Sequence, residues 1–172
     1  MWKGALLQIS STDEPKENLE LINNMINSAA AKNVEFVALP ETANCISNSN
    51  LHKETVLQTE KEDITLASLT EVAKKKSIYI LIGSLAIKQN MPKNKFLNRS
   101  FLINPLGSII AKYDKLHMFD ATISDSEEYI ESASFVAGKN AKIISTAIGK
   151  FGLSICYDVR FPHLYRGLSQ RG

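Results

Sequence analysis

Short apolar runs alternate with amphipathic helical patterns in the first half of the chain, and this alternation constrains the fold most. The apolar runs 5–9, 34–39 and 78–83 have the length of buried strands. Between these runs, apolar residues recur at the three- and four-residue spacing of one helix face: Leu19, Ile22, Met25, Ile26 and Ala29, then Leu66, Leu69, Val72 and Ala73. The order strand, helix, strand, helix, strand is typical of an α/β chain.

Capping signals mark where both helices should begin. Residues 11–15 offer a capping side chain followed by a proline in the first helical turn. Asp63 can cap the second helix. Between the second apolar run and Asp63, residues 42–60 are expected to form a polar loop.

The second half of the chain has a hairpin pattern. A loop at 91–94 is followed by strand-like stretches at 96–103 and 108–113, joined by the turn sequence Asn104-Pro105-Leu106-Gly107. A long loop over 114–138, strands at 142–146 and 151–155 and a helix over 161–171 should follow. This mixture does not fit a doubly wound sheet and predicts a mixed α/β (α+β) layered sandwich with helices outside.

Bulk composition fits one ordinary globular domain over residues 1–172. The net charge of +2 is too weak to indicate nucleic acid as the main partner. The basic run 74–76 falls at an expected helix end, where cations favour the helix dipole. The apolar start of the chain is too short for a signal peptide or a membrane span. We therefore expect a cytoplasmic protein with no membrane partner.

The cysteines and histidines suggest neither a metal site nor a disulfide framework. The cysteines are Cys45 and Cys156, and the three histidines have no ligand spacing. Cys45 lies in the expected polar loop and is interpreted as structural. No metal or organic cofactor is expected.

Three reactive residues occupy the same kind of position, just beyond the end of an apolar strand. They are Glu41, Lys115 and Cys156. Because ligand sites in open α/β sheets form outside the carboxyl ends of strands, these side chains are predicted to converge on one pocket.

Such a trio suits acyl transfer. A cysteine thiolate can attack a carbonyl or nitrile carbon and form a thioester-type intermediate that water cleaves. Glu41 could move the protons, while Lys115 and the backbone N–H of Tyr157 could hold the developing oxyanion.

Other interpretations remain open at this point. Each residue alone has an ordinary structural explanation, such as an inert core thiol. His117 or His163 could form a cysteine–histidine pair. A nucleophile elbow, however, normally has glycine two residues to either side, where this chain has Ser154 and Asp158.

The local sequences around the three residues resemble the signature blocks of the nitrilase superfamily of carbon–nitrogen hydrolases. The blocks are Leu39-Pro40-Glu41, Tyr113-Asp114-Lys115-Leu116-His117-Met118-Phe119-Asp120 and Gly152-Leu153-Ser154-Ile155-Cys156-Tyr157-Asp158-Val159-Arg160-Phe161-Pro162. Their order and spacing both fit, and the likeness runs from about Lys3 to the last residue.

The resemblance implies a four-layer αββα sandwich that hydrolyses non-peptide carbon–nitrogen bonds without metal or cofactor. Glu41 matches the general base, Lys115 the oxyanion lysine and Cys156 the nucleophile. A second family glutamate corresponds to Glu131, with Glu127 and Glu128 as competitors.

The resemblance also bears on the substrate. The blocks look most like the Nit-type branch, which includes ω-amidases and deaminated-glutathione amidases. Tyr157-Asp158 stand where true nitrilases usually have tryptophan and glutamate, so an amide is expected rather than a nitrile. Arg160 could bind a substrate carboxylate through a bidentate contact, or equally form an ion pair that holds the following helix.

Family members are longer than this chain, so residues 1–172 are expected to be the N-terminal part of the hydrolase domain and the sandwich to be incomplete. The alternative to an active amidase is therefore a truncated, inactive remnant or binding protein of the same fold. A homodimer formed through the helix that begins near Phe161 is implied by the resemblance.

Overall fold

The computed structural model describes residues 1–89, 95–124 and 127–172. The loop predicted at 91–94 lies outside the described residues. The largest sheet has five strands in the order β1-β2-β3-β4-β5. These strands are β1 (Gly4–Leu6), β2 (Phe36–Ala38), β3 (Tyr79–Lys88), β4 (Phe96–Ile103) and β5 (Ile109–Asp114). The first three are parallel, and β4 and β5 add antiparallel strands.

Two short antiparallel pairs and four α-helices complete the described structure. The pairs are β6 (Asp120–Ser124) with β7 (Glu127–Ile130), and β8 (Lys142–Thr146) with β9 (Gly149–Leu153). The helices are α1 (Pro15–Ala30), α2 (Asn50–Val56), α3 (Ile64–Lys76) and α4 (Pro162–Ser169), with 3-10 turns η1 (Glu131–Ala133) and η2 (Cys156–Arg160).

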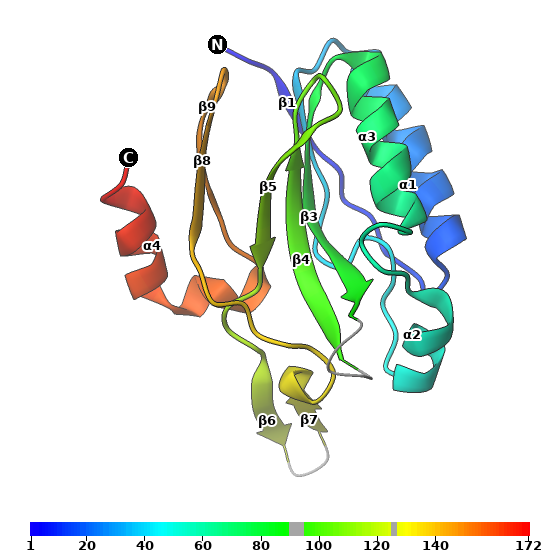
Figure 1. Ribbon diagram of the computed structural model, residues 1–172, viewed down its shortest axis with the longest axis vertical. Helices are drawn as coiled ribbons and strands as arrows, with labels where there is room; N and C mark the ends of the chain where they lie inside the picture. The colour runs from blue at the N-terminus through cyan, green and yellow to red at the C-terminus, as the bar shows by residue number, and fades with distance from the viewer. Residues whose placement is uncertain (90–94, 125–126) are drawn as a thin grey trace.

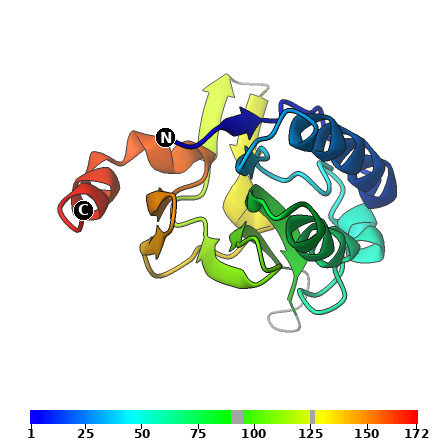
Figure 2. The same ribbon diagram turned by 90° about the horizontal axis from the view of Figure 1, so that it is seen from above.

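The elements stack in the layer order helix, sheet, sheet, helix (Figure 1). Helices α1 and α3 cover one face of the five-stranded sheet, the β8–β9 pair faces its other side, and α4 lies outside that pair. The view from above separates the same layers (Figure 2). The predicted αββα sandwich is thus confirmed, with a two-stranded second sheet.

Apolar side chains fill the space between the helices α1 and α3 and the large sheet, and the space between the two sheets. The larger cluster joins α1 and α3 to the sheet through residues such as Ile22, Leu69 and Ile80. A second cluster, which includes Leu102 and Leu153, joins the two sheets. Both clusters follow from the predicted apolar faces, since burying them removes apolar surface from water.

The predicted helix starts are correct, but only one has the expected cap. The Asp63 carboxylate accepts a hydrogen bond from Leu66 N at 2.7 Å. Pro15 begins α1 as predicted, yet the N-cap residue is Glu14, whose side chain makes no capping bond. Thr12 instead turns back onto the helix, since its N–H donates to Asn18 Oδ1 at 2.8 Å.

Two predicted loops contain regular structure. Helix α2 lies within 42–60, and β6, β7 and η1 lie within 114–138. The α2 sequence has one buried residue, Lys53, so it offers no apolar stripe to detect. Strands β6 and β7 are almost wholly exposed and lack the alternation that identifies a half-buried strand. Among the described residues, no helix is long and apolar enough to span a membrane.

Candidate active site

Strand direction brings Glu41 and Lys115 to one edge of the sheet. Strand β2 is parallel to β3, and two successive antiparallel pairings make β5 run the same way. Their carboxyl ends therefore meet at the same edge, where Glu41 follows β2 and Lys115 follows β5. The antiparallel β4 begins there, which places Asn98 between them.

Two close backbone approaches hold these chain segments, and each requires glycine. A Cβ on Gly83 would lie 2.3 Å from the carbonyl oxygen of Leu39 and 2.5 Å from that of Pro40, just before Glu41. A Cβ on Gly138 would lie 2.3 Å from the carbonyl oxygen of Asp114, just before Lys115. These separations are shorter than any side chain allows.

The Lys115 ammonium lies between two carboxylates. Its Nζ is 2.9 Å from Glu41 Oε1 and 2.9 Å from Glu131 Oε2. The Lys115 side chain is 2% exposed, so little solvent screens these pairs. Asn98 Nδ2 donates to Glu41 at 2.7 Å and to Glu131 at 3.1 Å, and so ties the two carboxylates together.

Glu131 makes contacts with the lysine and its neighbours that Glu127 and Glu128 lack. Glu131 also accepts a hydrogen bond from Phe119 N at 2.7 Å, which fixes its carboxylate beside Lys115. Glu127 instead accepts from Tyr129 Oη and Glu128 from Thr122 Oγ1, both on the exposed hairpin. Glu128 also lines the pocket but forms no ion pair with Lys115.

Cys156 stands at a sharp turn between β9 and η2. Its φ is +44°, a left-handed conformation that costs a non-glycine residue about 1 kcal/mol or more. Such a turn resembles a nucleophile elbow in shape, although Ser154 and Asp158 replace the usual glycines. The thiol is exposed at the pocket.

A buried carboxylate two residues after the cysteine organises this turn. Asp158 is completely buried and accepts from Ile155 N at 2.9 Å and from Tyr113 Oη at 2.6 Å. It also accepts from the backbone N–H of His117 at 3.0 Å and contacts His117 Nδ1 at 2.6 Å. Because Tyr113 and His117 flank Lys115 by two residues each, Asp158 joins the nucleophile turn to both sides of the lysine.

The site raises the pKa of both the thiol and the lysine. Burial, followed by the charge and hydrogen bonding of Glu41, raises the pKa of Cys156, and Lys115 offsets this only in part. Burial would lower the pKa of Lys115, but hydrogen bonds to Glu131 and Glu41 outweigh it. The resting site therefore holds a protonated thiol and a charged ammonium at neutral pH, so the thiol needs a base to become a nucleophile.

Glu41, Lys115, Glu131 and Cys156 all line one pocket of about 590 Å³. Asn98 and Lys53 also line it, and neither was a sequence candidate. A polar residue inside the apolar strand 96–103 could have indicated Asn98. Lys53 lies in a polar segment, where a lysine does not stand out.

Two of the proposed site residues, Tyr157 and Arg160, are not among the residues that line the pocket. Tyr157 follows Cys156 in η2, and its ring packs edge-on against Phe119 and Phe161. Arg160 is exposed at the end of η2 and is not part of the pocket lining. The Arg160–carboxylate contact remains a prediction.

The cysteine–histidine alternative lacks geometric support. His117 faces Asp158 and stacks on Phe161 with ring centroids 3.5 Å apart. His163 is exposed on α4. Cys45 is buried, and burial above all raises the pKa of its thiol to about 11, as expected for an inert structural cysteine.

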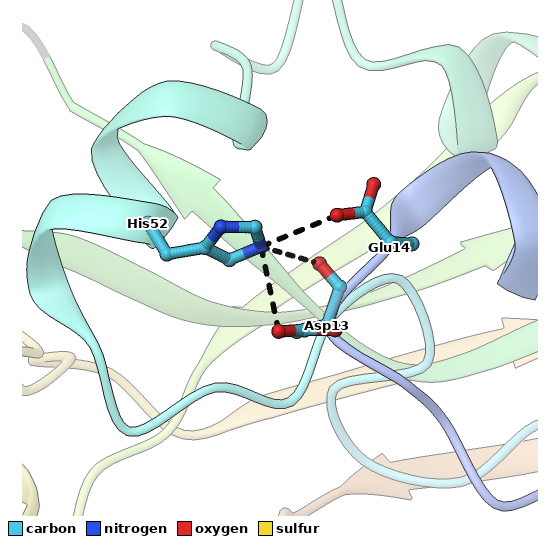
Figure 3. Close-up of side chains that lie close together, drawn as sticks. All are labelled: Asp13, Glu14 and His52. Atoms are coloured by element: carbon cyan, nitrogen blue, oxygen red, sulfur yellow. Dashed lines mark hydrogen bonds and ion pairs between the residues drawn. The ribbon is translucent and has the colours of Figure 1, made fainter.

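One cluster of potential metal ligands occurs among the described residues, at Asp13, Glu14 and His52 (Figure 3). His52 Nε2 lies 3.0 Å from the carbonyl oxygen of Asp13, which can only accept a hydrogen bond. Nε2 must then carry the proton and has no lone pair for a metal. With its two carboxylates each 3.7 Å from Nε2, the cluster is a polar contact between α2 and the start of α1.

Comparison with known proteins agrees with this geometry. Residues 3–172 match the family described as carbon-nitrogen hydrolase. A deaminated glutathione amidase of Synechocystis sp. is 36% identical over 172 residues, which are 98% of this chain and 62% of that protein. A chloroplastic omega-amidase of Arabidopsis thaliana is 31% identical over 170 residues, which are 97% of this chain and 45% of that protein. The chain thus spans about half to two thirds of the length of these relatives.

Solved structures show the same fold. The Caenorhabditis elegans NitFhit protein superposes with a TM-score of 0.87 at 30% identity, covering 100% of this chain and 43% of that one. An amidase from Nesterenkonia sp. superposes with a TM-score of 0.78 at 22% identity, covering 97% and 60%. These matches, together with the three sequence blocks that meet in one pocket, show that the chain belongs to the carbon–nitrogen hydrolase family, within the nitrilase superfamily.

Proposed function

We propose that the chain carries an amidase site of Glu41, Lys115 and Cys156, which hydrolyses a small linear amide and releases ammonia. The observation that supports this most directly is the Lys115 ammonium held between Glu41 and Glu131 in the pocket that also contains the Cys156 thiol. A nucleophile, a proton acceptor and a fixed cation in one pocket are the parts that acyl transfer needs.

In the first half of the reaction, Glu41 takes the proton from the thiol as sulfur attacks the amide carbon. The negative charge that develops on the carbonyl oxygen is stabilised by the Lys115 ammonium and the Tyr157 N–H. When the carbon–nitrogen bond breaks, Glu41 returns the proton to the leaving nitrogen, and ammonia departs from a Cys156 thioester.

In the second half, Glu41 accepts a proton from water, and the hydroxide attacks the thioester carbon. The carbon–sulfur bond breaks, the thiol regains its proton, and the carboxylic acid leaves. Glu131 and Asn98 take no proton in this scheme. Their hydrogen bonds fix the positions of the Lys115 ammonium and the Glu41 carboxylate, so that little reorganisation is needed during the reaction.

The proposed substrate class is a small ω-amide, as in an ω-amidase or deaminated-glutathione amidase. Named relatives at 36% and 31% identity support this class. The pocket of about 590 Å³ can enclose a molecule of this size.

The test is ammonia release from succinamate and α-ketoglutaramate by the wild-type chain and by Cys156→Ala. Circular dichroism and a cooperative thermal transition establish first that both are folded. Release by the wild type and loss in the variant are expected. A folded wild-type chain that releases no ammonia would instead favour the binding-protein alternative.

We further propose a cytoplasmic homodimer formed through α4. Within the described range 162–169, no α4 residue is buried, so this helix is free to pack against a second copy. Light scattering coupled to size exclusion tests this, since a monomeric mass at micromolar concentration would contradict it.

A further inference from the structure

A buried lysine lies in the same pocket as the proposed catalytic group. Lys53 projects from α2 and is only 5% exposed. It lines the pocket that contains Cys156, Glu41 and Lys115.

The Lys53 ammonium has no counter-charge among the described residues. No hydrogen bond or ion pair to its Nζ occurs there, and its contacts are the rings of Phe96 at 5.5 Å and Phe135 at 5.2 Å. The neighbouring Cys45 thiol stays neutral, since its pKa is raised to about 11. Glu41 and Glu131 are already paired with Lys115. Glu128 lines the same pocket, but it is exposed on the hairpin and forms no ion pair with Lys53.

A purely structural role explains this lysine poorly. Two aromatic rings recover only part of the hydration that a buried ammonium loses. Burial accordingly lowers the pKa of Lys53. A methionine of similar length would fill the same space between Phe96 and Phe135 without that cost.

We infer that Lys53 binds a carboxylate on the substrate, and so selects ω-amides that carry a negative charge at the end opposite the amide. This inference rests on the proposed amidase function and names the group that sets its specificity. An anionic substrate supplies the missing counter-charge beside a lysine that is itself buried, where a charged hydrogen bond is strong. The aromatic rings hold the ammonium in place when the site is empty.

The test compares succinamate with butyramide, a neutral amide with the same number of carbons, in wild type, Lys53→Met and the control Lys76→Met. Lys76 is exposed at the end of α3. We expect Lys53→Met to lower kcat/KM for succinamate about 10- to 100-fold more than for butyramide, the range of one charged hydrogen bond. Lys76→Met should leave the ratio between the two amides at the wild-type value, and Lys53→Met should melt no lower than wild type.

A binding measurement separates this inference from the proposed chemistry. Calorimetry should show that Cys156→Ala binds succinamate. The double variant, Cys156→Ala with Lys53→Met, should bind succinamate at least tenfold more weakly. This result does not depend on whether the wild type hydrolyses the amide. An equal loss for both amides, an unchanged preference for succinamate, or no succinamate binding by Cys156→Ala would each overturn the role of Lys53. If the wild type releases no ammonia but succinamate still binds in a way that depends on Lys53, only the amidase proposal is overturned.

Discussion

Four polar side chains define the site at the scale of single residues. Glu41, Asn98, Lys115 and Glu131 form a closed set of contacts between 2.7 and 3.1 Å. One ammonium serves two carboxylates, and one amide bridges them. Each member therefore fixes the orientation of the others, and losing one should affect reaction rate more than folding.

The Glu131 contact can be tested with a matched pair of glutamates. Glu131→Gln removes the charge that holds Lys115, and we expect kcat to fall about 100-fold, as for a misplaced catalytic group. Glu127→Gln changes an exposed glutamate on β7, four residues before Glu131, and should leave kcat at the wild-type value. Steady-state ammonia release measures both. Equal rates in the two variants would contradict the positioning role of Glu131.

Replacing Glu41 with glutamine should make the Cys156 thiolate easier to form, although it should slow turnover. The charge and hydrogen bonding of Glu41 raise the pKa of Cys156, so the thiolate of Glu41→Gln should form at lower pH than that of wild type. The rate of alkylation of Cys156 by iodoacetamide, followed against pH by peptide mass, gives the midpoint. Glu17→Gln, on the exposed face of α1, should leave it unchanged. A midpoint that stays or rises in Glu41→Gln would refute this electrostatic account.

At the scale of elements, the site depends on contacts between strand ends and on one buried turn. Asp158 joins η2 to the segment after β5, and Gly83 lets β3 approach the end of β2. Neither residue touches the pocket. In the proposed reaction, both act only by fixing where Cys156, Lys115 and Glu41 lie.

Asp158→Asn should damage this alignment. An asparagine has a single acceptor oxygen for the donors that now surround the carboxylate, so a buried donor loses its partner. We expect about 1–3 kcal/mol lower stability to unfolding and at least a tenfold lower kcat. Tyr113→Phe removes one donor and leaves the others bonded to Asp158, and it should cost about 1 kcal/mol. Urea unfolding measures the stability of both variants, and ammonia release measures their kcat. Equal losses in Asp158→Asn and Tyr113→Phe would contradict the role of Asp158 in holding several donors.

Gly83→Ala should disturb the Glu41 segment directly. Its new Cβ would meet the backbone oxygens of Leu39 and Pro40, which cannot move without displacing β2. We expect about 1–3 kcal/mol of destabilisation, in the range of overpacked sites. Gly167→Ala is the control, because its Cβ would meet nothing within 4 Å and alanine favours a helix. Thermal unfolding in which Gly83→Ala matched Gly167→Ala would rule out the close approach.

At the scale of the whole molecule, the sequence predicted the layers well and the pocket walls poorly. Apolar periodicity located α1, α3 and the strands of the five-stranded sheet, because burial of those faces drives their folding. The polar α2 and the exposed β6–β7 hairpin lack such faces, so their sequences predict loops. Those two segments supply Lys53 and lead into Glu131.

The same contrast applies to the site. Their positions just after apolar strands predict Glu41, Lys115 and Cys156 as site residues, because the carboxyl ends of strands meet at one sheet edge. Asn98 and Asp158 were not found, since their importance comes from contacts with residues 33 to 57 positions away. Long-range hydrogen bonds of this kind have no local sequence pattern.

Cys156 is proposed to carry the acyl group of the amide, and hydroxylamine tests for this acyl-enzyme directly. Hydroxylamine attacks a thioester faster than water does, so it should divert the acyl group of succinamate into a hydroxamate as ammonia is released. We expect the wild-type chain to form hydroxamate in proportion to the hydroxylamine concentration, and Cys156→Ala to form neither hydroxamate nor ammonia. Ammonia release without hydroxamate, or release that survives in Cys156→Ala, would contradict a Cys156 acyl-enzyme.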